Sequence, residues 1–352
     1  MTVSAEPGPT KAVHARALSA LAFAGSFVVC ALAVGALAIT LLGRSGEPTV
    51  TLDLANPSPI KAPAPPVRHG EIALPPAGVP ITRPVYAGTA LLADPALIEN
   101  TAQGPMPRIA DDGRKPMTAY AAPAAAGKLK IAIVMSGLGL SARATQGALD
   151  GLPAAITLGF LPYAGDVGHW VALARARGHE VVLQVPMEPF DFPESDPGPH
   201  TLRAGQDEDA NRQRLAWAMT RFTGYAGVTN LLGQRFLSDA DALAPALTFL
   251  ARRGLYFYDD DAAPQSVAPT VGTQAGMAFA RGSAVLDTIG TALEIDRQLS
   301  ALEAEARQKG SAVGSAHLYP VSVARIAAWA KGLESRGFVL VPVSAIVTAP
   351  KQ

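Results

Sequence analysis

From Lys128 onward, short apolar runs alternate with amphipathic stretches. The runs are rich in β-branched residues and are bounded by glycine or polar positions, which predicts strands. They cover 129–134, 155–160, 180–185, 227–229, 255–258, 277–279, 284–286, 311–315 and 338–343. Apolar residues at helical spacing predict helices over 141–149, 167–177, 207–222, 238–253, 291–308 and 323–335. Repeated βα units predict a parallel sheet, so the fold class is α/β. Seven or eight units in about 225 residues fit a (β/α) barrel near its lower size limit, and an open doubly wound sheet is the alternative.

A different pattern precedes this region. Residues 17–43 carry no charge, and they are long enough to span a bilayer as one helix. Lys11, His14 and Arg16 precede the apolar stretch and favour a cytoplasmic tail over residues 1–16. A cleaved signal peptide is the alternative, but its apolar core is usually only about 7–15 residues long. We therefore expect a single-pass signal anchor in the inner membrane, with the rest of the chain in the periplasm.

About half of all the prolines fall within residues 44–127. Proline removes backbone donors and favours extended polyproline geometry. This segment is therefore predicted to be a flexible linker between the anchor and a folded domain over 128–352, although short pieces such as 85–92 can dock on the domain.

Composition narrows the function classes. Lys plus Arg and Asp plus Glu both number 29, and this zero net charge argues against a nucleic-acid partner. The single cysteine, Cys30, excludes a disulfide framework and a cysteine-based zinc site. Hydrophobic residues make up 49% and charged residues 16%, which excludes a wholly disordered chain.

In either architecture the functional face lies at the carboxyl ends of the strands. The polar residues that follow the predicted strands are therefore the candidates for chemistry. They are Ser136, Glu188, Asn230, Arg235, Asp259, Asp260, Asp261, Asp287 and His317.

Several of these segments resemble the divergent polysaccharide deacetylase family of bacterial envelope proteins, over residues from about 130 to 347. The matching stretches are Gly-Phe-Leu-Pro-Tyr at 159–163, Gly-His-Glu-Val-Val-Leu-Gln-Val-Pro-Met-Glu-Pro at 178–189, Asp-Pro-Gly-Pro at 196–199, Gly-Tyr-Ala-Gly-Val at 224–228 and Val-Pro-Val-Ser at 341–344. The resemblance implies a distorted (β/α) barrel of the polysaccharide deacetylase type. It also implies action on acetylated sugars, so that an envelope glycan or acetylated polysaccharide is the expected partner.

The chain departs from the family at the positions that carry the metal chemistry. The family usually has Ile-Asp-Asp-Leu-Gly after the first strand, where this chain has Ser136 and Gly137. The family histidine after the fourth strand is Leu231 here, and the histidine before Pro-Met-Glu-Pro is Gln184. Zinc is thus expected from the resemblance, but its ligands are lost. We predict no metal cofactor, and a weak or absent metal-dependent deacetylase activity.

The surviving residues have alternative interpretations. His317 is either the acid that protonates a leaving group, paired with Asp287, or a histidine that merely packs against it. The run Asp259-Asp260-Asp261 is either a solvated turn or, together with Asp287, a set of oxygens that can hold a hard cation. Asp259 is also a candidate catalytic carboxylate. Glu188 either caps a helix or binds a sugar hydroxyl.

Two further side chains are expected to bind substrate. Arg235 can grip a sugar oxygen or tie Asp259 in place, and Tyr163 can stack on a pyranose. Three hypotheses follow. They are a membrane-anchored deacetylase-like protein of envelope carbohydrate metabolism, a non-catalytic glycan-binding or scaffolding protein, and an active hydrolase with a rearranged site built from Asp259, Asp287 and His317.

Overall fold

The computed structural model describes residues 93–349. The predicted tail, the membrane anchor at 17–43 and the first part of the linker lie outside the described residues. Within 93–349 no helix combines the length and the apolar character that crossing a membrane requires.

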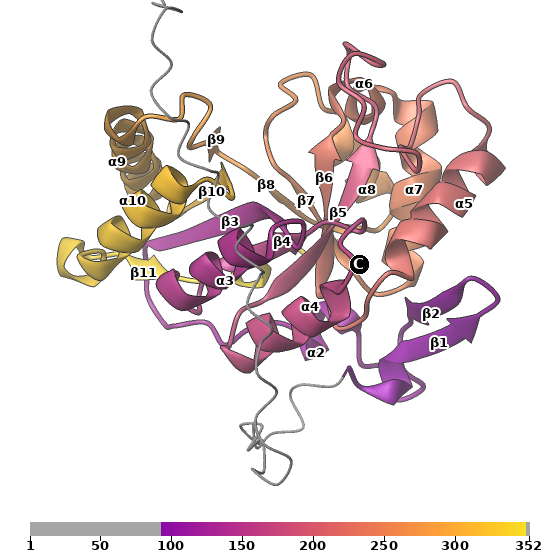
Figure 1. Ribbon diagram of the computed structural model, residues 1–352, viewed down its shortest axis with the longest axis horizontal. Helices are drawn as coiled ribbons and strands as arrows, with labels where there is room; N and C mark the ends of the chain where they lie inside the picture. Colours follow the sequence, from indigo (N-terminus) through magenta and orange to yellow (C-terminus); the bar gives the residue numbers. More distant parts are fainter. Residues whose placement is uncertain (1–92, 350–352) are drawn as a thin grey trace, which may run out of the picture. The chain divides into compact units, whose positions relative to one another are not determined.

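The strands of the domain form one curved sheet, at the centre of Figure 1. They are β3 (Lys130–Leu138), β4 (Thr157–Phe160), β5 (Val181–Met187), β6 (Gly227–Leu232), β7 (Tyr256–Asp259), β8 (Ala278–Arg281), β9 (Ala284–Val285), β10 (Ser311–His317) and β11 (Val339–Leu340). The order is β8-β7-β6-β5-β4-β3-β10-β9, with β11 beside β3, and every pair in this sheet is parallel. The parallel α/β fold predicted from the apolar runs is therefore confirmed.

The two edge strands, β8 and β9, are separated in the chain only by Gly282 and Ser283. Both edges of the sheet therefore lie next to each other. Individual hydrogen bonds join them. The Tyr258 hydroxyl lies 2.6 Å from Ser315 Oγ, and the backbone N–H of Ser283 donates to Val313 O at 2.7 Å. The sheet thus curls toward closure, consistent with a distorted barrel and not with an open doubly wound sheet.

Alternation along the strands separates an inner face from an outer one. Val134 of β3, Val182 of β5 and Tyr258 of β7 belong to one buried cluster inside the curve of the sheet. Ile133 of β3 and Leu183 of β5 belong to a larger cluster packed under the helices. Because both faces of the sheet are buried, the strands are almost continuously apolar, which is the pattern of a parallel sheet.

Helices surround the outer face of the sheet in Figure 1. They are α3 (Ala142–Gly151), α4 (Val167–Ala176), α5 (Glu208–Met219), α6 (Gln234–Ser238), α7 (Ala240–Arg252), α8 (Ala268–Gln274), α9 (Ala292–Lys309) and α10 (Pro320–Lys331). Short 3₁₀ segments lie at η2 (Pro95–Leu97), η3 (Glu334–Arg336) and η4 (Val343–Ala345). Four helices start at a side-chain N-cap, provided by Ser141, Asp207, Asp239 and Thr291. Such caps satisfy backbone donors that the first helical turn leaves free.

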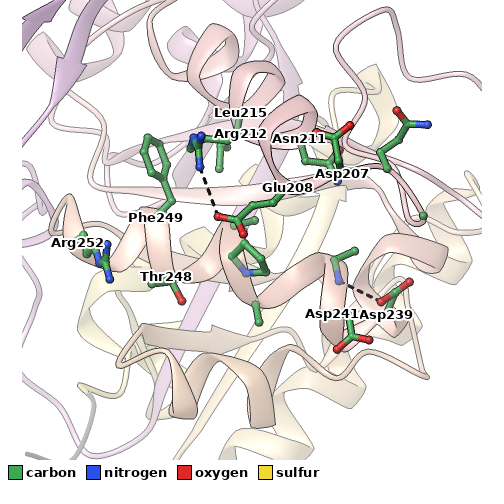
Figure 2. A pocket seen from close by; sticks show the side chains of 16 residues that line it. Asp207, Glu208, Asn211, Arg212, Leu215, Asp239, Asp241, Thr248, Phe249 and Arg252 are labelled. Atoms are coloured by element: carbon green, nitrogen blue, oxygen red, sulfur yellow. Dashed lines mark hydrogen bonds and ion pairs between the residues drawn. The ribbon is translucent and has the colours of Figure 1, made fainter.

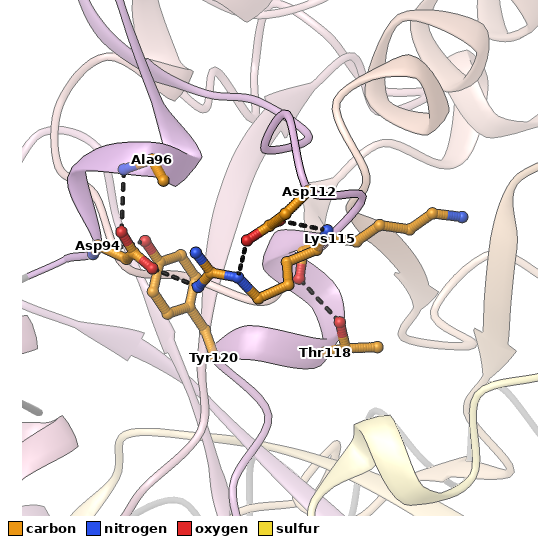
Figure 3. Close-up of polar contacts among 7 residues, drawn as sticks. Asp94, Ala96, Asp112, Lys115, Thr118 and Tyr120 are labelled. Carbon is orange, nitrogen blue, oxygen red and sulfur yellow. Dashed lines mark hydrogen bonds and ion pairs between the residues drawn. The ribbon is translucent and has the colours of Figure 1, made fainter.

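Residues 93–127 fall within the predicted linker, and in the structure they pack on the domain. They form the hairpin of β1 (Ile98–Thr101) and β2 (Gly104–Pro107), followed by α2 (Pro116–Ala119). Arg114 pairs with both Asp94 and Asp112. The Tyr120 hydroxyl accepts a hydrogen bond from Asp94 N at 3.1 Å, and Figure 3 labels Asp94, Asp112 and Tyr120 in this group. The Tyr120 ring is buried in the inner cluster, so this segment covers the amino end of the curled sheet.

A carboxylate is buried at that amino end. Glu180 is fully buried, and its Oε1 accepts hydrogen bonds from Tyr256 Oη at 2.8 Å, Ser344 N at 3.1 Å and Thr157 Oγ1 at 3.2 Å. Its Oε2 accepts from Ala122 N at 3.3 Å. Burial raises the pKa of Glu180, although these hydrogen bonds oppose the shift. Glu180 therefore joins β4, β7 and both ends of the described chain at a point remote from the carboxyl ends of the strands.

Candidate functional site

His317 and Asp287 meet at the carboxyl end of the sheet. His317 Nδ1 lies 2.8 Å from Asp287 Oδ1, and the backbone N–H of His317 donates to Asp287 Oδ2 at 2.7 Å. Ser322 of α10 donates a third hydrogen bond to Oδ2 at 2.6 Å. The carboxylate is fully buried, whereas 49% of the imidazole is exposed. A ring held at Nδ1 by a buried carboxylate presents its other nitrogen to solvent.

The same contacts fix the charges of this pair. Burial by itself would raise the pKa of Asp287, but the hydrogen bonds from His317 and Ser322 outweigh it and hold that pKa below its ordinary value. The hydrogen bond from Asp287 raises the pKa of His317 against the effect of burial, and the charge of Asp260 adds to the rise. The ionised Asp287 carboxylate thus favours the imidazolium form of His317.

Asp259 and Asp260 point to different sides of the sheet. Asp259 has the same parity in β7 as Phe257, which packs under the helices, and it is fully buried. Its Oδ1 accepts from Asp261 N at 3.1 Å. Asp260 follows the inward-facing Tyr258 by two positions, and its carbonyl accepts a hydrogen bond from Ser315 Oγ at 2.9 Å. The structure therefore brings Asp260, and not the predicted Asp259, to the same side as His317.

Ser136 and Gln184 form the floor beside this pair. Ser136 is the register partner of both His317 in β10 and Gly159 in β4. Gln184 Oε1 accepts a hydrogen bond from Gly137 N at 2.6 Å. A Cβ built on Gly159 would lie 3.2 Å from Ser136 Oγ and 3.2 Å from Gln184 Cγ, so these two side chains pack closely over the glycine and leave little room for a side chain there. We call Ser136, Gln184, Asp260, Asp287 and His317 the mouth cluster.

Leu231 lies on β6, opposite Pro186 of β5, and is partly exposed. Its neighbour Asn230 accepts a hydrogen bond from Asp260 N at 3.2 Å and donates to Leu232 O at 2.7 Å. Asn230 thus positions the backbone at the start of the Asp260 loop.

Glu188 and Arg235 have contacts that explain them as structural residues. Glu188 is buried, and its Oε2 accepts from Ala204 N at 2.7 Å. Its carbonyl accepts from Arg235 N and Phe236 N, both at 3.1 Å, and the Arg235 guanidinium lies 3.3 Å from Oε1. Glu188 therefore joins the loop after β5 to the start of α6, as expected of a capping residue, and Arg235 pairs with Glu188 rather than with Asp259.

Tyr163 is engaged by its own loop. Its hydroxyl accepts a hydrogen bond from His200 N at 3.3 Å, and its ring packs at 5.3 Å from the ring of Trp217. The His200 ring stacks on Trp217 at 3.5 Å. The aromatic ring proposed for stacking on a sugar therefore already has protein neighbours.

A hollow of about 1060 Å³ lies elsewhere. It runs between α5 and α7 and is lined by none of the predicted site residues (Figure 2). Asp207 and Asp239 on its wall cap the two helices. Helix capping therefore accounts for these two carboxylates.

Comparison with known proteins identifies the fold family. Residues 133–347 match the family model described as divergent polysaccharide deacetylase. The chain belongs to this family. The resemblance noted in the sequence is thereby confirmed.

Proteins of other bacteria are similar to this chain. A crystal structure of an uncharacterized protein from Agrobacterium tumefaciens C58 is 39% identical, covers 69% of this chain and all of that chain, and superposes with a TM-score of 0.68. The uncharacterized protein YibQ of Escherichia coli K12 is 25% identical over 207 residues, which are 59% of this chain and 63% of YibQ. A protein of Haemophilus influenzae Rd is 24% identical over 204 residues, or 58% of this chain and 72% of the relative.

Zinc does not fit the residues found at the family's metal positions. A catalytic zinc site uses three protein ligands, usually histidine and carboxylate. Ser136, Gln184 and Leu231 offer a hydroxyl, an amide and an aliphatic chain. Among residues 93–349, no three His, Cys, Asp or Glu side chains gather as a group that could hold a metal ion.

The sequence predicted His317 and Asp287 as catalytic residues, and it gave Asp260 only a role in a turn or a cation site. It treated Ser136 and Gln184 as lost family ligands. One signal for Asp260 was available, because the alternation of inward residues from Tyr256 through Tyr258 continues to position 260.

Proposed function

We propose that this member of the divergent polysaccharide deacetylase family binds an acetylated envelope glycan at the mouth cluster and has lost metal-dependent deacetylation. The family membership supports an acetylated sugar as ligand. The replacement of metal-ligand residue types by Ser136, Gln184 and Leu231 supports the loss of the metal step.

The observation that carries the proposal is the location of the exposed apolar side chains. Among residues 93–349, five large hydrophobic residues are exposed by 52–82%, and all five follow the carboxyl ends of strands or begin the next helix. They are Leu140, Phe190, Ile289, Leu293 and Tyr319. Exposed apolar groups gathered on one side of a soluble domain mark a binding surface.

The chemistry of this surface suits a sugar. The apolar faces of pyranose rings and acetyl methyl groups pack on aromatic side chains such as Phe190 and Tyr319. Hydroxyl and amide groups of the ligand can exchange hydrogen bonds with Ser136, Gln184 and His317 in the floor. The Tyr319 ring lies 5.8 Å from the His317 ring, so the apolar and polar parts adjoin.

The predicted anchor at 17–43 belongs to the same proposal. It would hold the domain in the periplasm, with the Pro-rich segment before residue 93 setting its distance from the inner membrane.

Calorimetry on the full chain in detergent micelles tests the binding. Chitotetraose, with four N-acetyl groups, is expected to bind more tightly than the fully deacetylated glucosamine tetramer. Tyr319→Ala is expected to weaken binding by about 3- to 10-fold, the value of one aromatic contact. Lys309→Ala is the control, because Lys309 is the last residue of α9 and lies near the amino ends of the strands, away from the mouth cluster. Equal affinity for both sugars, or no effect of Tyr319→Ala, would contradict the proposal.

A further inference from the structure

We propose that another hollow of the domain binds an acidic sugar, that is, a sugar unit that carries a carboxylate or a phosphate group. The hollow measures about 500 Å³, and Gln103, His200, Gln213, Arg214 and Trp217 are among the residues that line it. This volume lies within the range of about 300–1,000 Å³ that is typical of small-molecule sites. The hollow shares no residue with the mouth cluster, so this inference does not depend on the proposed function.

One face of α5 forms the floor of this hollow, because four of its lining residues repeat at spacings of three and four along the helix. They are Ala210, Gln213, Arg214 and Trp217. The turn between β1 and β2 supplies Gln103, and Thr101 Oγ1 holds this turn by accepting from Gln103 N at 3.2 Å. A Cβ built on Gly104 would lie 3.2 Å from Thr220 Cβ, so the turn packs closely on the end of α5.

The Asp-Pro-Gly-Pro motif at 196–199 places His200 at the wall of the hollow. Asp196 Oδ1 accepts a hydrogen bond from Gly198 N at 2.8 Å, and the Tyr163 hydroxyl accepts one from His200 N at 3.3 Å. Gly198 has φ +120°, and a Cβ built on it would lie 2.5 Å from Tyr163 Oη. Glycine at this position therefore allows the loop to approach the Tyr163 ring, and the motif holds His200 against α5.

Two further contacts fix this loop on α5. The Asn211 side chain accepts from Arg203 N and donates to Arg203 O, both at 2.9 Å. The His200 ring stacks on Trp217, with the ring centroids 3.5 Å apart and the planes inclined by 10°. The walls of the hollow are thus held in place by the protein itself, and a ligand that binds there orders few additional groups.

The hollow carries positive charge, and the residues described along its wall include no Asp or Glu. Within residues 93–349, Arg214 and Arg221 form no ion pair: Arg214 lies 3.4 Å from the Asn211 amide oxygen, and the Arg221 guanidinium lies 4.9 Å from the centre of the Trp217 ring. Burial lowers the pKa of His200, and the charges of Arg221 and Arg214 lower it further. Both charges therefore act at the wall of the hollow, where they favour an anion.

The groups around this charge suit a sugar that carries an acidic group. The Arg214 guanidinium can bind a carboxylate or a phosphate through two parallel hydrogen bonds. The side-chain amides of Gln103 and Gln213 can exchange hydrogen bonds with sugar hydroxyl groups, and the apolar face of a pyranose packs on aromatic side chains. A bare ion would use the arginine alone, so the amides and aromatic rings favour an acidic sugar.

Titration of the full chain in detergent micelles, with ¹³C-labelled histidine, tests the site. The probes are glucuronate, glucose 6-phosphate, glucose and inorganic phosphate. Both acidic sugars are expected to bind about 10-fold or more tightly than glucose, the value of one charge-assisted hydrogen bond. They should also raise the pKa of His200, because a bound anion favours the imidazolium. The His200 signal is identified by its loss in His200→Gln.

Substitutions on α5 locate the anion. Arg214→Gln should weaken the binding of both acidic sugars about 10-fold or more. Arg214→Lys keeps the charge but not the paired donors, so it should weaken binding less. Arg212→Gln is the matched control, because it removes the same charge from the same helix, whereas Arg212 pairs with Glu208 and Asp209 and lines the hollow between α5 and α7. Circular dichroism checks that each variant is folded.

The outcomes are distinct. Tighter binding of glucuronate assigns the site to a uronic acid, tighter binding of glucose 6-phosphate assigns it to a sugar phosphate, and either result supports the proposal. Equal affinity for glucose and the acidic sugars overturns it, as does inorganic phosphate that binds as tightly as glucose 6-phosphate. An equal loss in Arg214→Gln and Arg212→Gln, or no loss in a folded Arg214→Gln, also overturns it. Chitotetraose binding at the mouth cluster is unaffected by any of these results.

Discussion

The side-chain carbonyl of Gln184 accepts a hydrogen bond from the backbone N–H of Gly137 at 2.6 Å, which ties β5 to the end of β3. The two residues stand where the family usually has a histidine and the second of two aspartates. In this chain an internal hydrogen bond therefore connects positions that would otherwise face a cation.

Returning the family aspartate to position 137 is expected to destabilise the domain. Gly137 has φ +94°, a conformation that costs a residue with a Cβ about 1–2 kcal/mol. We expect Gly137→Asp to lower the free energy of unfolding by about that amount in urea denaturation. Gly147→Ala is the control, because Gly147 is exposed in α3 without a positive φ and the change should add about 0.5–1 kcal/mol. Equal stability of Gly137→Asp and the parent would show that the backbone there relaxes.

Removing the Asp287 charge is expected to lower the pKa of His317. That pKa is raised chiefly by the hydrogen bond with Asp287, so Asp287→Asn should bring it down toward or below about 6.5. NMR titration of the histidine ring protons measures the change. The ring of His179 gives an internal reference, since it is buried and lies 2.9 Å from Ile156 O, away from Asp287. A His317 pKa that stays raised in this variant would show that another group sets it.

The same pair makes stability depend on pH at two ends. The folded pKa of His317 is raised, so its stabilising effect is present below about pH 6.5 and is lost as the pH rises through the folded value. The folded pKa of Asp287 is lowered, so its effect is present above about pH 4 and is lost as the pH falls through the folded value. The stability added by the pair should be greatest between these limits. Urea denaturation from pH 3 to pH 9 is expected to show this maximum, and Asp287→Asn should flatten it.

Glu180 is expected to be critical for the amino end of the sheet. Glu180→Ala leaves the Tyr256 hydroxyl and the Ser344 and Ala122 N–H groups without their acceptor. Each unsatisfied buried donor costs about 1–3 kcal/mol. Glu180→Gln keeps one side-chain oxygen, which can still accept from Tyr256 Oη, Ser344 N and Thr157 Oγ1. It should therefore cost less stability than Glu180→Ala. Thermal unfolding of the two variants checks the order, and a reversed order would show that the cavity rather than the hydrogen bonds dominates.

The predicted anchor has a direct test. Deletion of residues 17–43 should convert a protein that stays in the membrane pellet after carbonate washing into one that is released. Replacing Leu32 by Arg, near the middle of the apolar stretch, should weaken retention by a different route. Release of the unaltered full chain by carbonate would instead favour the cleaved signal peptide.

Much of the fold could be predicted from local pattern. The apolar runs located β3, β4, β5 and β10, because strands covered on both faces leave a continuous signal in the sequence. The pattern missed α6 and α8, which are short and lack a clear apolar period. The packing of 93–127 was also missed, since single buried side chains such as Leu97 and Tyr120 hold that segment rather than a periodic face.

The site was harder to predict than the fold. The pairing of His317 with Asp287 joins residues 30 positions apart at the ends of adjacent strands. Both were located because they follow predicted strands, and His317 also lies in a motif that resembles the family's. The contact between Asp260 and Ser315 crosses from β7 to β10, and no local pattern reports such an approach. The sequence identified Gln184 and Ser136 only as lost family ligands, whereas in the structure the two side chains pack together over Gly159.

The meeting of the sheet's two edges at Gly282 and Ser283 has a mechanical consequence. Tyr258, Ser283 and Ser315 join these edges through a few individual hydrogen bonds, where every other neighbouring pair of strands shares a backbone ladder. The β7–β8 and β9–β10 sides of the sheet therefore separate more easily here than neighbouring strands do elsewhere. Asp260 follows β7 on one side of this junction, and His317 ends β10 on the other. Small changes in the width of that junction would set how far apart the two groups stand when a ligand enters.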